Sequence, residues 1–174
     1  MDDVSMELLI LAHLSRAPSH GYELKRRIAA TLGGQVEVHN NTLYPALRRL
    51  EDAGAVSRTP QAQEGRPPRH VYAITELGGE LMHDLLVDLP PQAAASDQEF
   101  LTRVAFFGLL TAAERRSVLA ARDQALRERL DHLRATARRE DHTHWSSQVI
   151  AHATDRLEAE RAWVARLGES GPDQ

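Results

Sequence analysis

The stretch from Asn40 to Gly54 constrains this chain most, because it predicts a short helix with two different faces. Leu43, Leu47 and Leu50 recur at helical spacing and form one apolar stripe. Polar and aromatic residues crowd the opposite side. One face is expected to pack against a core, and the other to point outward.

Both ends of this helix are marked. Asn40 or Asn41 can accept hydrogen bonds from the unpaired amides of the first turn, and Pro45 is early enough for its missing N–H to cost little. Gly54 can adopt the left-handed conformation that ends a helix. We expect the helix to run over about residues 41–53.

The outward face combines amides, a hydroxyl, a phenol and guanidinium groups. It carries Asn41, Thr42, Tyr44, Pro45, Arg48 and Arg49. Arginine reads guanine through two hydrogen bonds, asparagine reads adenine, and hydroxyl groups bond phosphate. The face therefore suits DNA. The alternative is an ordinary solvated helix face, so the surrounding elements must decide.

Composition narrows the class of protein. At 174 residues without cysteine, the chain can form one domain, or a small domain with an appendage, and it has no disulfide or thiolate metal site. No apolar run approaches the roughly 18 residues needed to span a bilayer, and the Asp2-Asp3 start does not resemble a signal peptide. We expect a cytoplasmic protein with no membrane partner.

The charge does not favour a nucleic-acid partner. The net charge is -4, and residues 1–88 hold 9 Lys or Arg against 12 Asp or Glu. DNA-binding domains often have a pI above about 9. Any affinity for DNA must therefore come from local clustering of arginine.

Two helices are expected before the central one. Residues 4–15 are mostly apolar and are expected to form the first helix, with Glu7 and His13 on a narrow solvent-exposed side. A second helix is expected over 21–32 after a break at Pro18-Ser19. Its inward residues are expected to be Tyr22, Leu24, Ile28 and Leu32.

After Gly54 the pattern changes to that of a β-hairpin, with strands at 55–60 and 69–74 and a long tip at 61–68. Arg66 lies in this Gly- and Pro-rich tip, beside acidic Glu64, and Arg69 lies just beyond. An arginine in such a tip can bond phosphates or enter a minor groove. Three helices followed by a basic hairpin indicate a winged helix-turn-helix.

A fourth helix is expected over 76–89, capped by Thr75, and Pro90-Pro91 ends it. Its apolar side is expected to carry Leu77, Leu81, Leu85, Leu86 and Leu89. We interpret 92–95 as a linker, which separates a DNA-binding domain at 1–89 from a helical domain at 96–170.

The second half has a helical pattern throughout. Ser96 with Glu99, and Thr111 with Glu114, have the spacing of capping boxes. The expected helices cover 96–110, 111–139 and 143–167. The last two carry narrow apolar stripes that suit one partner helix each. We expect them to pair antiparallel and to associate with a second copy of the chain.

With these residues in view, the first half resembles the PadR family of bacterial transcriptional regulators over roughly residues 5–88. The matching motifs are His20-Gly21-Tyr22-Glu23, Asn41-Thr42-Leu43-Tyr44-Pro45-Ala46-Leu47-Arg48-Arg49-Leu50-Glu51, and Tyr72-Ala73-Ile74-Thr75-Glu76-Leu77-Gly78. The second half agrees with extended family members in length and helical character, without a sharp motif.

The resemblance implies a homodimeric repressor that binds a palindromic operator and releases it when a small aromatic or drug-like ligand binds. Tyr22 and Tyr72 would hold the helices and the wing together at the edge of the core. The residues expected at double-stranded DNA are Asn41, Thr42, Tyr44, Pro45, Arg48, Arg49, Arg66 and Arg69.

Other functions have weaker support. The chain shows no phosphate loop or nucleophile motif of an enzyme and no cofactor signature. His142, His144 and His152 lack a clear metal-ligand spacing. The alternative to a DNA-binding regulator is a winged-helix module for protein partners.

For an effector, the aromatic side chains of Trp145, Trp163 and Phe107 are the candidates for stacking on a ligand. Helix packing and a dimer core are the alternative role for these residues.

Overall fold

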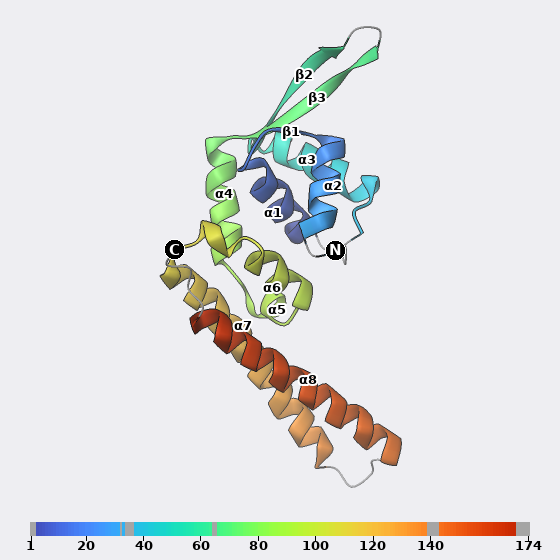
Figure 1. Ribbon diagram of the computed structural model, residues 1–174, viewed down its shortest axis with the longest axis vertical. Helices are drawn as coiled ribbons and strands as arrows, with labels where there is room; N and C mark the ends of the chain where they lie inside the picture. Colours follow the sequence, from blue (N-terminus) through green and yellow to red (C-terminus); the bar gives the residue numbers. More distant parts are fainter. Residues whose placement is uncertain (1–2, 32, 34–36, 64–65, 139–142, 170–174) are drawn as a thin grey trace. The chain divides into compact units, whose positions relative to one another are not determined.

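The computed structural model describes residues 3–31, 33, 37–63, 66–138 and 143–169, with the side chains of 3–4, 62–63 and 66–68 excepted. It is mainly helical with one small antiparallel sheet, as predicted (Figure 1). Contacts divide it into two units, Met1–Asp88 with Leu101–Leu110, and Leu89–Phe100 with Thr111–Gln174. The predicted functional division at 89–96 stays a prediction.

Helix α1 (Asp3–Leu14) is the core of the first unit, with contacts to α2 (Gly21–Thr31), α3 (Asn40–Asp52) and α4 (Glu76–Val87). Its apolar side chains on every face are buried: Met6, Leu8, Leu9, Ile10, Leu11, Ala12 and Leu14. A helix that is apolar all round must be covered on all sides. These three helices and β3 contribute to that cover.

His13 of α1 is also buried, so the prediction that it lies on the solvent-exposed side of the helix was wrong. Its Nε2 lies 2.6 Å from the Thr31 hydroxyl, and its ring meets Phe106 edge-on at 5.6 Å. Burial, together with the positive charges of Arg16 and Arg27, lowers the pKa of His13 to about 4. The sequence pattern missed this because Thr31 and Phe106 come from distant segments.

The buried His13 predicts a loss of stability in acid. Between pH 6.5 and 4 the His13 side chain is protonated in the unfolded chain but neutral in the folded chain. The free energy of unfolding therefore falls as the pH falls. At pH 4.5 the loss attributable to this one group is about 2 kcal/mol. Urea unfolding at pH 7 and 4.5 should show a larger drop for the wild type than for H13Q. Equal drops would contradict the assignment.

The sheet has the order β1-β3-β2, in which β1 (Ser19–His20) and β2 (Val56–Gln63) both pair antiparallel with β3 (Arg66–Ile74). The expectation of a loop over 61–68 was wrong, because the pairing continues to Gln63 opposite Arg66. Proline is tolerated here because β2 is an edge strand and β1 covers β3 only at Val71 and Tyr72. The short β1 was not predicted.

Helix α4 begins as predicted, with the Thr75 hydroxyl accepting a hydrogen bond from the Gly78 N–H at 3.1 Å. Leu86 and Leu89 are buried, but Leu77 is 52 % exposed, so its expected place on the apolar side was wrong. The residue that meets the core in this first turn is Gly78, which lies directly against the Ala55 carbonyl.

The expected linker is largely a short helix, α5 (Pro91–Ala94), and Ala94 is buried. The prediction of one continuous helix over 96–110 was also wrong. That segment consists of α6 (Asp97–Val104), followed by a 3-10 turn, η1 (Phe107–Leu109). The Glu99 N–H donates to Ser96 Oγ at 3.4 Å, which is one half of the predicted capping box.

The second unit is dominated by the antiparallel hairpin of α7 (Ala112–Ala137) and α8 (His144–Glu169), which confirms the predicted pairing of these helices (Figure 1). Thr111 and Glu114 form both halves of the predicted capping box. Within the described residues, no helix is long and apolar enough to cross a membrane.

Candidate nucleic-acid interface

Helix α3 has the two faces that its sequence predicts. Leu43, Ala46, Leu47 and Leu50 are buried. The opposite side leaves Asn41, Tyr44, Pro45, Arg48 and Arg49 exposed and Thr42 half-buried. The polar face is therefore available to a partner.

The expected asparagine cap at the start of α3 was wrong. His39 occupies the N-cap position, and its side chain makes no capping hydrogen bond in the described structure. Asn40 instead accepts a hydrogen bond from Lys25 Nζ at 2.9 Å. Because Lys25 belongs to α2, this bond ties the start of α3 to that helix. Gly54 ends the element with φ +75°, as predicted.

The two arginines of α3 differ in their surroundings. The Nε of Arg49 donates to Glu7 Oε1 on α1 at 3.0 Å, so this side chain is partly neutralised. Arg48 is exposed and forms no ion pair with any residue that the structure describes. Arg48 is therefore the better placed of the two to meet an external anion.

The wing contributes two described cations, and one of them, Arg58 of β2, forms an ion pair with Glu51 of α3 at 3.2 Å. Arg69 is exposed and pairs with Gln61 across the hairpin. The side chains of Arg66 and Glu64 lie outside the described residues. Tyr72 is buried in β3 as expected, and it pairs with Ser19 of β1. It therefore holds the wing to the helices.

Tyr22 was predicted to point inward but is 73 % exposed. It lies two residues before Leu24, which is about 200° around a helix, so the buried Leu24 and Ile28 turn Tyr22 outward. Tyr44 lies beside it, with its ring against Gly21. Helical spacing alone could have placed Tyr22 outside.

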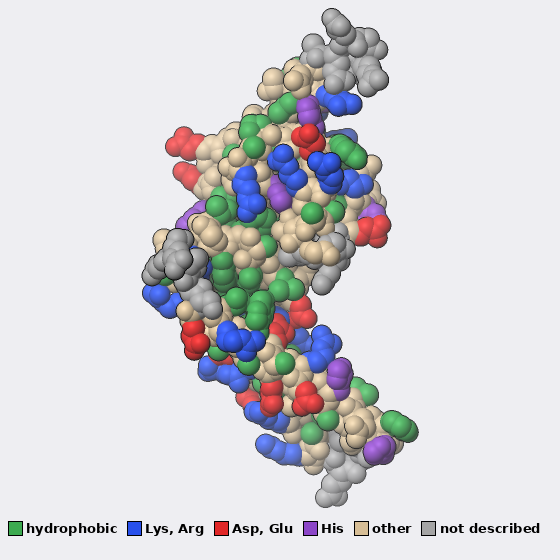
Figure 2. All heavy atoms as spheres, viewed as in Figure 1, with side chains coloured by type: hydrophobic (Ala, Val, Ile, Leu, Met, Phe, Trp, Pro, Cys, Tyr) green, Lys and Arg blue, Asp and Glu red, His purple; other side chains and the backbone are tan. Residues whose placement is uncertain are grey.

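These residues meet in a hollow of about 500 Å³, which we call the wing groove. It is lined by His20, Gly21, Tyr22, Glu23, Arg26, Tyr44, Arg69, His70 and Tyr72. Figure 2 shows Lys and Arg side chains gathered over α2 and α3. The acidic net charge of residues 1–88 thus coexists with a basic face.

The two tryptophan candidates for an effector site lie far apart on α8. Trp145 is 77 % exposed and contacts the His144 ring, whereas half-buried Trp163 meets Phe100 edge-on at 5.9 Å. The two Trp positions are separated by roughly 27 Å along α8. Phe107 belongs to the other unit.

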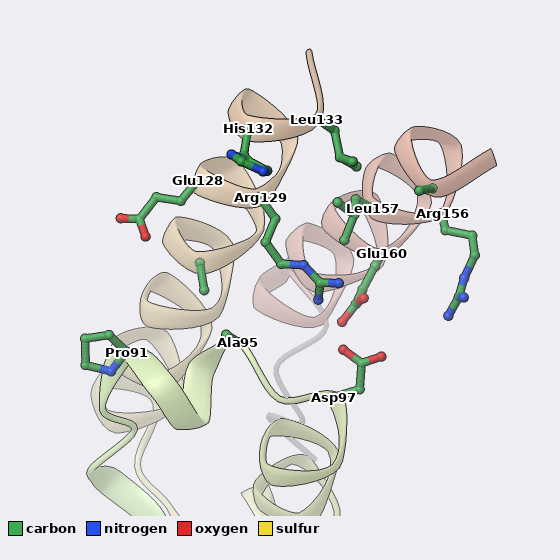
Figure 3. Close-up of a pocket in the computed structure, with 12 residues that line it drawn as sticks. Pro91, Ala95, Asp97, Glu128, Arg129, His132, Leu133, Arg156, Leu157 and Glu160 are labelled. Carbon is green, nitrogen blue, oxygen red and sulfur yellow. The ribbon is translucent and has the colours of Figure 1, made fainter. Parts of the chain in front are cut away.

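The second unit contains a different hollow, of about 600 Å³, which we call the hairpin pocket (Figure 3). It is lined by Pro91, Ala95, Asp97, Ala125, Glu128, Arg129, His132, Leu133, Ala153, Arg156, Leu157 and Glu160. Figure 3 shows Asp97, Arg129 and Glu160 directed into this space. Sequence reasoning missed it.

One feature of the sequence could have indicated this pocket: Arg122 is a charged residue on the predicted apolar stripe of α7. It is fully buried, and both Asp97 and Glu160 form ion pairs with its guanidinium. A buried guanidinium needs such partners.

The histidines of the second half do not form a metal centre among the described residues, where no group of three potential ligands is found. His142 lies outside the described residues.

Comparison with known proteins finds a family similar to the first part of the chain. The profile of the transcriptional regulator PadR-like family matches residues 10–84, which include α2, α3, the sheet and most of α4. This part of the chain is similar to that family. The match covers the wing groove and the polar face of α3, but not the α7–α8 hairpin.

Two curated proteins that are similar to this chain are described as transcriptional regulators. The negative transcriptional regulator PadR of Bacillus subtilis is 24% identical over 109 residues, which are 63% of this chain and 60% of the relative. A probable transcriptional regulator of Mycobacterium tuberculosis is 38% identical over 69 residues, 40% of this chain and 36% of that protein. The chain thus matches only part of the length of either relative.

Solved structures of Bacillus subtilis PadR are also similar. The complex with operator DNA has 19% identity and a TM-score of 0.47, covering 94% of this chain and 97% of that chain. The complex with p-coumaric acid has 19% identity and a TM-score of 0.43, covering 95% and 97%.

Proposed function

We propose that this PadR-like protein is a sequence-specific DNA-binding regulator, a cytoplasmic homodimeric repressor of a palindromic operator. The observation that carries the proposal is the outward face of α3, where Arg48 and Tyr44 are exposed and Arg69 of the wing lines the same groove as Tyr44. In this proposal α3 enters the major groove and the wing contacts the flanking backbone.

The DNA contacts are assigned to Asn41, Thr42, Tyr44, Pro45, Arg48, Arg49, Arg66 and Arg69. The competing proposal is a protein-interaction module, which the acidic charge of residues 1–88 favours. A protein partner would not impose the steep salt dependence that release of counterions from DNA causes.

The decisive test is R48A, measured by fluorescence anisotropy against the DNA upstream of the protein's own gene. We expect affinity to fall by about 10- to 100-fold, because a lost arginine contact to a base or phosphate costs about 1–3 kcal/mol. R166A, which removes an exposed arginine near the end of α8, is the matched control and should bind normally. Unchanged binding by R48A would favour the protein-interaction module.

Glu7 predicts an effect in the opposite direction. E7Q removes the carboxylate that holds Arg49 and should raise DNA affinity up to about fivefold, because an exposed ion pair contributes about 0–1 kcal/mol. E80Q makes the same charge change at an exposed position on α4 and should have a smaller effect. Equal affinities for E7Q and E80Q would show that the pairing does not restrain Arg49.

The homodimer is assigned to the α7–α8 hairpin. Trp145 and Val149, one turn apart on α8, are 77 % and 68 % exposed, and a second copy could cover them. A two-fold dimer would bind two half-sites about 34 Å apart, or a multiple of that. Sedimentation equilibrium should give twice the chain mass. W145A together with V149A should shift the equilibrium toward monomer if these side chains lie in the interface.

We further propose that a small aromatic or drug-like ligand relieves repression. Trp145, Trp163 and Phe107 were the sequence candidates, but the hairpin pocket offers a volume of about 600 Å³, which suits a small molecule. Arg129 projects into it beside apolar Leu133 and Leu157, an arrangement that fits an aromatic carboxylate. p-Coumaric acid is therefore a suitable probe. It should release DNA from the wild type but not from R129A.

A further inference from the structure

Helix α6 belongs to both units of the molecule. The division between the units falls inside it, between Phe100 and Leu101, so its first half has its contacts in the second unit and its last half in the first. An α-helix is a rigid element, and such elements can carry a structural change from one site to another. The contacts at the two ends of α6 therefore indicate what this helix connects.

The start of α6 is fixed to the α7–α8 hairpin by Arg122. The Oδ1 of Asp97, the first residue of α6, accepts a hydrogen bond from Arg122 Nη2 at 2.6 Å. The ring of Phe100, almost one turn later, lies 5.1 Å from the same guanidinium and meets Trp163 of α8 edge-on at 5.9 Å. The first turn of α6 thus depends on one buried arginine of α7.

The two carboxylates on Arg122 are held unequally. Glu160 accepts hydrogen bonds from both Nε and Nη2 of Arg122, and its side chain is 22 % exposed. Asp97 accepts one described hydrogen bond, and its side chain is 54 % exposed. Turning a half-exposed carboxylate into water costs less than moving one that is mostly buried. Asp97 is therefore the partner of Arg122 that a second carboxylate can replace.

The charges around the hairpin pocket favour this replacement. Asp97, Glu160 and Arg129 point into the pocket (Figure 3), and Arg129 is exposed and forms no ion pair with the residues that the structure describes. Arg122 and Arg129 together balance the two carboxylates. The other charged residues of the lining have opposite signs and cancel: Glu128 and Arg156. A third carboxylate in the pocket is in excess, so its entry favours the departure of Asp97.

The far end of α6 is anchored in the first unit. The Nη2 of buried Arg103 donates to the Asp88 carbonyl, at the end of α4, at 3.0 Å. Phe106, whose N–H donates to the Arg103 carbonyl at 2.9 Å, meets the His13 ring edge-on at 5.6 Å. His13 belongs to α1, which packs against α3. A movement of α6 is thus connected to the helix that is assigned to DNA.

We propose that the carboxylate of a ligand in the hairpin pocket replaces Asp97 on Arg122, and that the released start of α6 carries the change to α1 through Arg103 and Phe106. The inference rests on the proposed ligand response and names the residue that couples the ligand to DNA. Asp97 is a positioning residue, because it holds α6 in the arrangement that binds DNA. The ligand binds best where the bond between Asp97 and Arg122 is broken, so it shifts the population toward that state.

The test uses D97N in the full-length protein, with p-coumaric acid as the ligand and the DNA upstream of the protein's own gene. Calorimetry should show that D97N binds the acid about five- to tenfold more tightly, because no aspartate competes for Arg122. Anisotropy should show that the acid weakens DNA binding by the wild type about 5- to 150-fold, the usual range of coupling between two sites. D97N without the acid should already bind DNA as weakly as the wild type with it, and the acid should change this little.

Two further variants separate coupling from a general loss of structure. D131N makes the same charge change at Asp131 of α7, which is 78 % exposed and pairs with Arg134 at 3.8 Å, and it should match the wild type in both measurements. D97E keeps the carboxylate and should restore most of the ligand response. Methyl p-coumarate has no carboxylate and should leave DNA bound to the wild type.

The outcomes distinguish this inference from the function on which it rests. If the acid releases DNA equally from D97N and the wild type, the role of Asp97 is wrong and the ligand response stands. Weaker binding of the acid by D97N would mean that Asp97 contacts the ligand and does not compete with it. A wild type that binds DNA without responding to the acid overturns the ligand response and this inference together, but leaves the DNA-binding function in place.

Discussion

Replacing Arg122 by methionine will lower the free energy of unfolding by about 3–5 kcal/mol, the usual cost of breaking a buried ion pair. The guanidinium donates to the Ala94 carbonyl at 2.6 Å, to Asp97 Oδ1 at 2.6 Å and to Glu160 Oε1 at 2.9 Å, and it lies 5.1 Å above the Phe100 ring. Methionine nearly conserves the volume but removes every donor. The measurement is urea unfolding followed by Trp163 fluorescence, because that ring packs against Phe100.

The control is R134M, which breaks an exposed pair between Arg134 and Glu158 on the same two helices. It should cost about 0–1 kcal/mol, because water screens exposed charges. An R122M protein as stable as the wild type would mean that apolar packing replaces the ionic network without loss. The same variant should also alter the hairpin pocket, since Asp97 and Glu160 line it and both pair with Arg122.

Replacing Gly78 by alanine will destabilise the first unit by about 3 kcal/mol, near the upper end of the usual cost of overpacking. A Cβ at Gly78 would lie 2.0 Å from the Ala55 carbonyl oxygen and 2.8 Å from Ile74 Cγ1. The first turn of α4 would have to move away. That movement strains the hydrogen bond from the Thr75 N–H to Ala55 and the bond from the Thr75 hydroxyl to the Gly54 carbonyl.

Gly79 is the matched control, because a Cβ there meets nothing within 4 Å. G79A should stabilise the protein by about 0.5–1 kcal/mol, the usual gain of alanine over glycine inside a helix. Thermal unfolding of the two variants should therefore shift in opposite directions. A similar shift for both would show that the contact with Ala55 relaxes at little cost.

The same close approach has a functional consequence. Residues 54–55, next to Gly78, join α3 to the first strand of the wing. If α3 and the wing bind DNA together, their relative position depends on this contact. G78A is then expected to weaken DNA binding even below its unfolding temperature, whereas G79A is not.

Local patterns in the sequence determined much of this protein. The leucine spacing of α3, the turn at Gly54, the Thr75 cap and the capping box of Thr111 with Glu114 all depend on residues within a few positions of one another. Helix propensity, capping and turn formation act over such distances. For the same reason the bounds of α7 and α8 could be predicted closely.

Tertiary contacts decided the remaining features. His13 is buried because Thr31 and Phe106 cover it. Arg122 can be buried because its guanidinium donates hydrogen bonds to Ala94, Asp97 and Glu160. Those partners lie 18 to 93 residues away in the chain, so no local pattern could identify them. The wing groove likewise exists only because β1 pairs with β3 and brings the start of α2 beside Tyr44 and Arg69.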